Sequence, residues 1–250
     1  MKKILVLGRS SASTQMLIQC LKSNSYHVRW LEERRSDKKI LFKNRVKKHG
    51  FLIVLGQLIF LAYQQYLNIR SRGRKEEILN DFGLSGIFTA DFVTPNVNDI
   101  SAFEYISSVN ADLIVLSGVR ILSPHLLASV NCVVLNIHAG INPTYRGVHG
   151  GYWALVNDDI SHCGSTIHRV DEGIDTGEVL AYAKINIEKN DNFVTYPLLQ
   201  QKAALELLPK IIDSIFTGDY EPLKVETDSK IWTHPTIWQY FIYRTCRGIK

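Results

Sequence analysis

The sequence lacks the cysteine patterns that mark disulfide frameworks and metal centres. Its 250 residues include only four cysteines, and these lie far apart: Cys20, Cys132, Cys163 and Cys246. The histidines of the central region also lack a spacing typical of a metal site: His149, His162 and His168. Zinc sites combine closely spaced Cys and His ligands. We therefore expect reduced thiols in a cytoplasmic protein, and no bound metal.

An internal repeat, a low-complexity tract and a G-x-S-x-G motif are also missing. The missing motif argues against a serine nucleophile on a sharp turn, and no cysteine stands in a context that suggests one. The composition is 46% hydrophobic and 21% charged, as in an ordinary globular protein. A chain of 250 residues suffices for one large domain, or for a domain with a small appendage.

One apolar segment, Phe51 to Leu67, tests this interpretation. Its apolar part is shorter than the run of about 20 residues that a spanning helix needs, so we expect no membrane span. Apolar residues recur in it at helical spacing: Phe51, Leu55, Leu58, Ile59, Ala62 and Tyr66. The spacing predicts an amphipathic helix that packs this face on the protein body, or on a second subunit in a homodimer. Lying on a membrane surface is an alternative, because the flanks are basic.

Acidic residues are scarce between positions 29 and 75, where three of them accompany thirteen basic residues. An excess of this kind can face nucleic acid, an anionic membrane or a phosphorylated substrate. A solvated helical face is the simpler interpretation, and we expect no nucleic-acid partner. Residues from about 34 to 80 are predicted to form a basic amphipathic helical insertion.

Strand-like and helical segments alternate along the chain. Buried strand patterns at residues 2–8, 111–118 and 132–138 are separated by helical patterns, and a long helix is predicted at residues 196–218. This order predicts an α/β fold: a Rossmann-like, mostly parallel sheet with helices on both faces. We expect a catalytic domain over residues 1–218 and a short C-terminal extension over residues 219–250.

Three polar residues stand where chemistry is expected. Ligands bind at the carboxyl ends of strands in such sheets, and Asn136 and His138 end one strand with their side chains on the same face. Asp175 lies in a turn between two strand-like runs. The amide can donate to a developing oxyanion, the imidazole can donate or move a proton, and the carboxylate can orient the imidazole or hold a water. This set suits acyl transfer to a nucleophile that the substrate supplies.

Two motifs carry a family resemblance. "NIHAGINPTYRG" and "GSTIHRVDEGIDTGEVL" contain the pattern N-x-H, P-x-Y-x-G, G-x-x-x-H and D-x-G over roughly residues 111–218. This pattern resembles the formyltransferases that use 10-formyltetrahydrofolate, which act on glycinamide ribonucleotide, methionyl-tRNA or amino sugars. The resemblance implies that Asn136, His138 and Asp175 are the catalytic trio, with His138 protonated, and that 10-formyltetrahydrofolate is the formyl donor.

The same resemblance implies two folate-binding loops. One contains Val119, Arg120, Ile121 and Leu122, which would hold the pterin largely through their backbone. The other contains Val170, Asp171 and Gly173. Arg120 pairing with a surface acid and Asp171 capping a turn are alternatives to folate contact. His168 matches a family histidine whose role we interpret as structural.

The acceptor is inferred by elimination. "LGRSSASTQ" departs from the glycine-rich phosphate loop of the glycinamide ribonucleotide enzymes, although Arg9 and Ser10 remain candidates for phosphate contact at a helix start. Arg146 and His149 are further candidates for acceptor contact. Residues 219–250 are too few for the tRNA-binding barrel of the methionyl-tRNA enzymes. We therefore expect a dTDP-, GDP- or UDP-linked amino sugar destined for surface polysaccharide such as the O-antigen of lipopolysaccharide. A formyltetrahydrofolate hydrolase is a further alternative.

Overall fold

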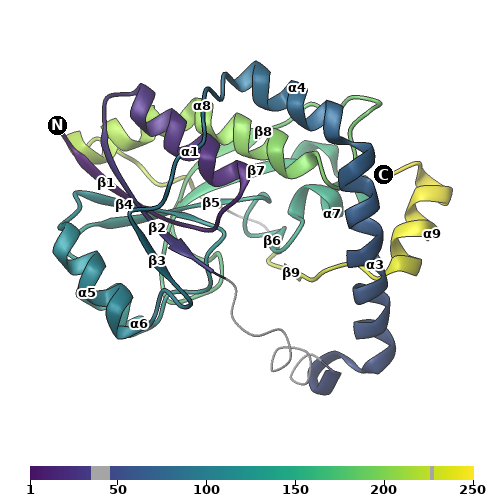
Figure 1. The fold of residues 1–250 in the computed structure, drawn as a ribbon. Helices are drawn as coiled ribbons and strands as arrows, with labels where there is room; N and C mark the ends of the chain where they lie inside the picture. Colours follow the sequence, from purple (N-terminus) through teal and green to yellow (C-terminus); the bar gives the residue numbers. More distant parts are fainter. Residues whose placement is uncertain (35–45, 226–227) are drawn as a thin grey trace.

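A seven-stranded sheet forms the centre of the computed structural model, which describes residues 1–34, 46–225 and 228–250. Its strand order is β3-β2-β1-β4-β5-β7-β8 (Figure 1). Strands β3 to β5 run parallel, whereas β7 pairs antiparallel with both β5 and β8. The predicted Rossmann-like, mostly parallel sheet is therefore confirmed. Its strands are β1 Lys3–Gly8, β2 His27–Glu33, β3 Phe92–Thr94, β4 Leu113–Ser117, β5 Val133–His138, β7 Gly164–Arg169 and β8 Val179–Lys184.

Helices cover both faces of the sheet, because alternate residues of a buried strand point to opposite sides. Ile4 and Val6 of β1 enter one hydrophobic cluster, and Leu5 and Leu7 enter another. The first cluster lies under α1, α4 and α8, and the second lies against α5 and α6 (Figure 1). These helices are α1 Ala12–Ser23, α4 Arg72–Phe82, α5 Ile100–Val109, α6 Pro124–Ser129 and α8 Tyr196–Thr217.

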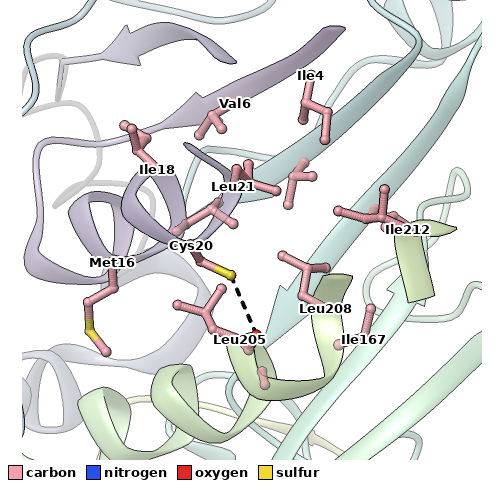
Figure 2. Packing of buried hydrophobic residues seen from close by; sticks show 14 of the residues in the cluster. Ile4, Val6, Met16, Ile18, Cys20, Leu21, Ile167, Leu205, Leu208 and Ile212 are labelled. Atoms are coloured by element: carbon pink, nitrogen blue, oxygen red, sulfur yellow. Dashed lines mark hydrogen bonds between the residues drawn. The ribbon is translucent and has the colours of Figure 1, made fainter. Parts of the chain in front are cut away.

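The contact between α1 and α8 is aliphatic. Figure 2 shows side chains of α1 (Met16, Ile18 and Leu21) and of α8 (Leu205, Leu208 and Ile212) in one cluster with strands of the sheet. The thiol of Cys20 donates to the carbonyl of Leu205 at 3.5 Å. Burial raises the pKa of Cys20 to about 11, so this thiol stays protonated at neutral pH. All four cysteines are free.

A second body of packed residues, the aromatic lobe, lies beside the sheet. It consists of β6 Arg146–Gly147, α3 Phe51–Arg70, α7 Gly150–Val156, β9 Ile231–Trp232 and α9 Ile237–Arg247. The 3₁₀ turn Ile160–His162 follows α7. Phe60 is fully buried at the lobe centre, with its ring centroid 4.8 Å from that of Phe193 and 4.9 Å from that of Tyr240. The C-terminal segment is therefore packed into the molecule, through β9 paired with β6 and through α9 packed beside α3.

Helix α3 packs on the protein body with the face opposite to the one predicted, and the predicted face stays open to the alternatives of a second subunit or a membrane surface. Residues 35–45 of the expected insertion lie outside the described residues, but α3 itself is described. Val54, Gln57, Phe60 and Leu67 are buried, whereas the predicted packing residues are exposed: Phe51, Leu55, Leu58, Ile59, Ala62 and Tyr66. Both faces of α3 are apolar, so periodicity could not choose between them. Phe60 decides the outcome because its ring fits the aromatic cluster, and the amide of Gln57 donates to the His234 carbonyl at 2.7 Å.

Candidate active site

Strand β5 carries Asn136 and His138 at the carboxyl end of the sheet. Asn136 lies opposite Leu116 on β4 and opposite His168 on β7. His138 is 6% exposed, whereas Asn136 is partly exposed. The amide is thus accessible to a ligand, and the imidazole lies deeper.

Asp175 meets both residues from a separate loop. Its Oδ1 lies 3.4 Å from Asn136 Nδ2, and its Oδ2 lies 3.4 Å from His138 Nδ1. Asp175 has a φ of 52°, a left-handed conformation that Asp tolerates better than most residues. The three predicted residues therefore lie together, and their catalytic role remains a prediction.

His168 is a fourth member of the cluster that sequence reasoning assigned only a structural role. Its Nδ1 lies 2.8 Å from the carbonyl oxygen of Arg169, which can only accept, so Nδ1 carries the proton. Its Nε2 can then accept from Asn136 Nδ2 at 3.1 Å. This bond fixes one amide hydrogen of Asn136 and leaves the other for Asp175 or for a ligand. The cross-strand register was the signal that could have found it.

The ring of His138 lies between two acceptors. Its Nε2 lies 2.8 Å from the carbonyl oxygen of Tyr145, so Nε2 carries a proton. Its Nδ1 faces the carboxylate of Asp175. Burial lowers the pKa of His138, although Asp175 and the Tyr145 carbonyl act to raise it. The protonated His138 that is expected in the reaction stays a prediction.

Asp175 is held in its ionised form. Burial acts to raise its pKa, but His168, His138 and the Gly147 amide together hold the pKa below its ordinary value. The Gly147 amide donates to Asp175 Oδ2 at 3.1 Å. A proton between these two groups would be shared by Asp175 Oδ2 and His138 Nδ1.

The loop after β5 closes against these groups, and the aromatic lobe holds it there. A Cβ on Gly140 would lie 2.2 Å from the Tyr145 carbonyl and 2.8 Å from His138 Nε2, so no larger residue fits. Gly147 has a φ of 94° and pairs with Trp232 of β9. The indole of Trp232 donates to the Thr144 carbonyl at 2.9 Å. Sequence reasoning found no role for Trp232, because a strand of two residues gives no periodic signal.

The first predicted folate loop follows β4. Its backbone is partly engaged within the protein: the Arg120 amide donates to Glu33 at 3.0 Å, and the Ile121 carbonyl accepts from Asn98 at 3.0 Å. The guanidinium of Arg120 pairs with buried Glu33, not with the surface acid that was the alternative. Leu122 is a core residue, so only its backbone could meet a ligand.

The second predicted folate loop follows β7. Val170 packs against the same core cluster as Val119 and Leu122, so both loops border one side of the sheet. Asp171 Oδ1 accepts from the Gly173 amide at 3.0 Å and from the Thr176 hydroxyl at 2.7 Å. These two bonds match the turn-capping alternative for Asp171. They also order the loop that contains Asp175.

Arg9 and Ser10 lie at the end of β1. Gly8 is paired with Ser117 on β4, and the preceding residue of β4, Leu116, is paired with Asn136 on β5. Two strand spacings of about 4.8 Å separate β1 from β5. Arg9 pairs with buried Glu33 at 3.6 Å, and Ser10 is exposed just before Ser11, which caps α1. Both residues therefore stand on the same edge of the sheet as the trio.

Arg146 and His149 have structural contacts. Arg146 donates through Nε to the Ile174 carbonyl at 2.8 Å and through Nη1 to Ser229 at 2.6 Å, so it ties the Asp175 loop to the C-terminal segment. His149 packs against His234, with ring centroids 4.6 Å apart. Burial, with a smaller effect from His234, lowers the pKa of His149 to about 3. The structure thus turns His149 toward the aromatic lobe.

The donor set suits an organic acyl donor. Among the described residues, no group of three His, Cys, Asp or Glu side chains could hold a metal ion. An accessible amide, an imidazole and an ionised carboxylate converge between two loops, and these groups fit a formyl donor held by backbone and apolar contacts.

The fold and this cluster define an α/β protein with an amide, imidazole and carboxylate site at the carboxyl edge of its sheet. The family model described as "Formyl transferase" matches residues 68–212, more than half of the chain. The chain therefore belongs to the formyl transferase family, as the motifs predicted.

The relatives differ in the acceptor that their names give. The chain is 34% identical over 128 residues to a methionyl-tRNA formyltransferase of Finegoldia magna, covering 49% of this chain and 40% of the relative. It is 29% identical over 129 residues to a GDP-perosamine N-formyltransferase of Brucella melitensis, covering 51% and 49%. The chain thus spans about half or less of the length of these relatives.

A solved structure shares the fold. It is formyltransferase PseJ of Anoxybacillus kamchatkensis in complex with UDP-4,6-dideoxy-4-formamido-L-AltNAc and tetrahydrofolate. The similarity has a TM-score of 0.54 and 18% identity, and covers 98% of this chain and 93% of the other.

Proposed function

We propose that the protein is an N-formyltransferase that moves a formyl group from 10-formyltetrahydrofolate to the amine of a nucleotide-linked amino sugar. The convergence of Asn136, His138 and Asp175 beside an accessible edge of the sheet carries this proposal. The sugar product named in the PseJ structure and the name of the Brucella relative support the choice of acceptor class. We further propose that the product is used in surface polysaccharide synthesis.

The geometry supports the following proposed reaction. The acceptor amine attacks the formyl carbon, a new C–N bond forms, and the bond from that carbon to the folate nitrogen breaks. Asn136 donates to the formyl oxygen as negative charge develops, with the hydrogen that otherwise faces Asp175. His168 keeps the other hydrogen and so holds the amide plane in place.

The proton of the amine goes to the departing folate nitrogen. His138 Nδ1 and Asp175 Oδ2, which lie 3.4 Å apart, relay this proton. The Tyr145 carbonyl fixes the ring tautomer, so that Nδ1 is the nitrogen free to take the proton. A His138 that holds this proton is the protonated imidazole of the sequence-based expectation.

A panel assay tests the proposal. Purified protein is incubated with 10-formyltetrahydrofolate and dTDP-, GDP- or UDP-linked amino sugars, and the formylated product is detected by mass. Glycinamide ribonucleotide and methionyl-tRNA are included, the latter because the Finegoldia relative carries that name. Formylation of either of these alone would contradict the sugar acceptor, and formate release without an acceptor would indicate a hydrolase.

We also propose contacts for the other predicted site residues. Arg9 and Ser10 are proposed to contact the diphosphate of the acceptor, because they share an edge of the sheet with the trio. Val119, Arg120, Ile121, Leu122, Val170, Asp171 and Gly173 are proposed to border the folate. The homodimer and the cytoplasmic location are predictions as well.

A further inference from the structure

Helix α3 presents an apolar stripe to the outside of the molecule. Its exposed large hydrophobic side chains are between 38% and 75% accessible, and most recur at helical intervals: Phe51, Leu52, Ile53, Leu55, Leu58, Ile59, Tyr66 and Ile69. This helix is, within the described ranges, the one long and apolar enough to cross a membrane, and 28% of its apolar window is buried. A stripe of this extent indicates an interaction surface.

Exposed side chains of the neighbouring helix α9 widen this apolar surface. The indole of Trp238 lies so close to α3 that a Cβ on Gly56 would be 2.3 Å from it. The rings of Phe241 and Tyr63 are 5.2 Å apart, and those of Tyr63 and Tyr66 are 5.8 Å apart. Trp238, Phe241 and their neighbour Ile242 are all exposed. The two helices lie side by side at one end of the molecule, away from the sheet (Figure 1).

Basic residues outnumber acidic residues around this surface. Residues 46–75 contain six Lys or Arg residues and no Asp or Glu, and residues 229–250 contain four and none. Arg72 is paired with Glu76 at 2.8 Å and Arg74 with Asp191 at 2.9 Å, so neither is available to a partner. Lys47, Lys48 and Arg70 are exposed and form no ion pair with any described residue.

We propose that α3 and α9 form a docking surface for an anionic lipid bilayer, with α3 lying in the plane of the membrane. Apolar side chains flanked by unpaired cations match the acyl boundary and the negative headgroups. Charge disfavours a second copy of the chain as the occupant: twofold self-pairing would bring these cations together, and α3 and α9 themselves carry no acid to neutralise them.

The helix lies on the membrane and does not cross it. Val54, Gln57 and Phe60 are at most 3% exposed and pack into the protein body. Spanning would pull these residues out of the aromatic lobe and break the bond from Gln57 to the His234 carbonyl. Surface docking keeps that packing intact and uses only the residues that already face outward.

Sedimentation with vesicles tests the proposal on the full chain. We expect binding to phosphatidylglycerol–phosphatidylcholine vesicles, weakening as salt rises, and little binding to phosphatidylcholine alone. The double variant Leu58→Glu/Ile59→Glu should lose at least roughly tenfold in affinity. The matched double variant Ile100→Glu/Ile160→Glu changes two exposed residues elsewhere and should bind as the wild type does.

The basic residues are tested separately. Replacing Lys47, Lys48 and Arg70 with Ala should weaken binding by roughly fivefold for each charge removed. Failure of the wild type to bind anionic vesicles at low salt would overturn the proposal, and so would equal binding by the Leu58→Glu/Ile59→Glu variant. A dimer in light scattering that this variant converts to a monomer would instead assign the surface to a second copy.

Discussion

The sheet and the aromatic lobe are built differently, and the site draws on both. Aliphatic side chains at period-two positions hold the sheet between its helices. The lobe is held by stacked and edge-on rings around Phe60, together with hydrogen bonds from Gln57 and Trp153 to backbone carbonyls. The sheet supplies Asn136 and His138, whereas the lobe holds the loop whose Gly147 amide fixes Asp175. The geometry of the candidate site therefore depends on two packing systems at once.

The largest effect should come from the centre of the lobe. Phe60→Ala removes a fully buried ring, and we expect the free energy of unfolding to fall by about 3–5 kcal/mol. Phe51→Ala is the matched control on the same helix, because Phe51 is exposed, and its change should stay within about 0.5 kcal/mol. Urea unfolding followed by circular dichroism measures both. Equal effects would mean that α3 is not anchored by Phe60.

The second largest effect should fall on kcat and not on the free energy of unfolding. Asn136→Ala removes the oxyanion donor, and we expect kcat to fall by about 10²–10³, with the free energy of unfolding little changed because Asn136 is partly exposed. Asn68→Ala on α3 is the matched control and should leave kcat unchanged. Turnover of the sugar acceptor with 10-formyltetrahydrofolate measures both variants. A wild-type rate in Asn136→Ala would remove this amide from the mechanism.

Acid should destabilise the lobe through His149. The folded-state pKa of about 3 lies below the ordinary value near 6.5, so the unfolded chain binds a proton that the folded chain excludes. Stability is therefore full above about pH 6.5 and falls toward pH 3, by at most about 1.4 kcal/mol per pH unit. His149→Asn keeps a residue tolerant of the left-handed φ of 60° and should flatten this slope. Unfolding midpoints between these pH values check the prediction, and an unchanged slope would contradict it.

The smallest effect concerns the positioning of Asn136. His168→Phe removes the acceptor of one amide hydrogen, and we expect kcat to fall by about threefold to tenfold, as for one lost hydrogen bond. His168→Gln can still accept and should restore part of the rate. KM for the acceptor should change little in both variants. A rise in KM with constant kcat would show that His168 acts on binding.

The features that could be predicted from the sequence are those with strong local patterns of apolar and polar residues. Consecutive apolar residues in β4 and β5 indicated buried parallel strands, and the strand-end position of Asn136 and His138 gave the site. The remaining features depend on contacts between distant residues. The inner face of α3 is chosen by Phe193 and Tyr240, and the pKa of His138 is lowered by burial. The pairing of β6 with β9 joins residues more than 80 positions apart and leaves no periodic trace.

The pairing of Gly147 with Trp232 links the C-terminal segment to the proposed catalytic site. A chain cut before Ser229 would retain every side chain of the trio. It would lose the indole that holds Thr144, the hydroxyl that holds Arg146 and the strand that fixes Gly147. We expect such a truncated chain to leave Asp175 without a fixed amide donor and so to lose the proposed formyl transfer.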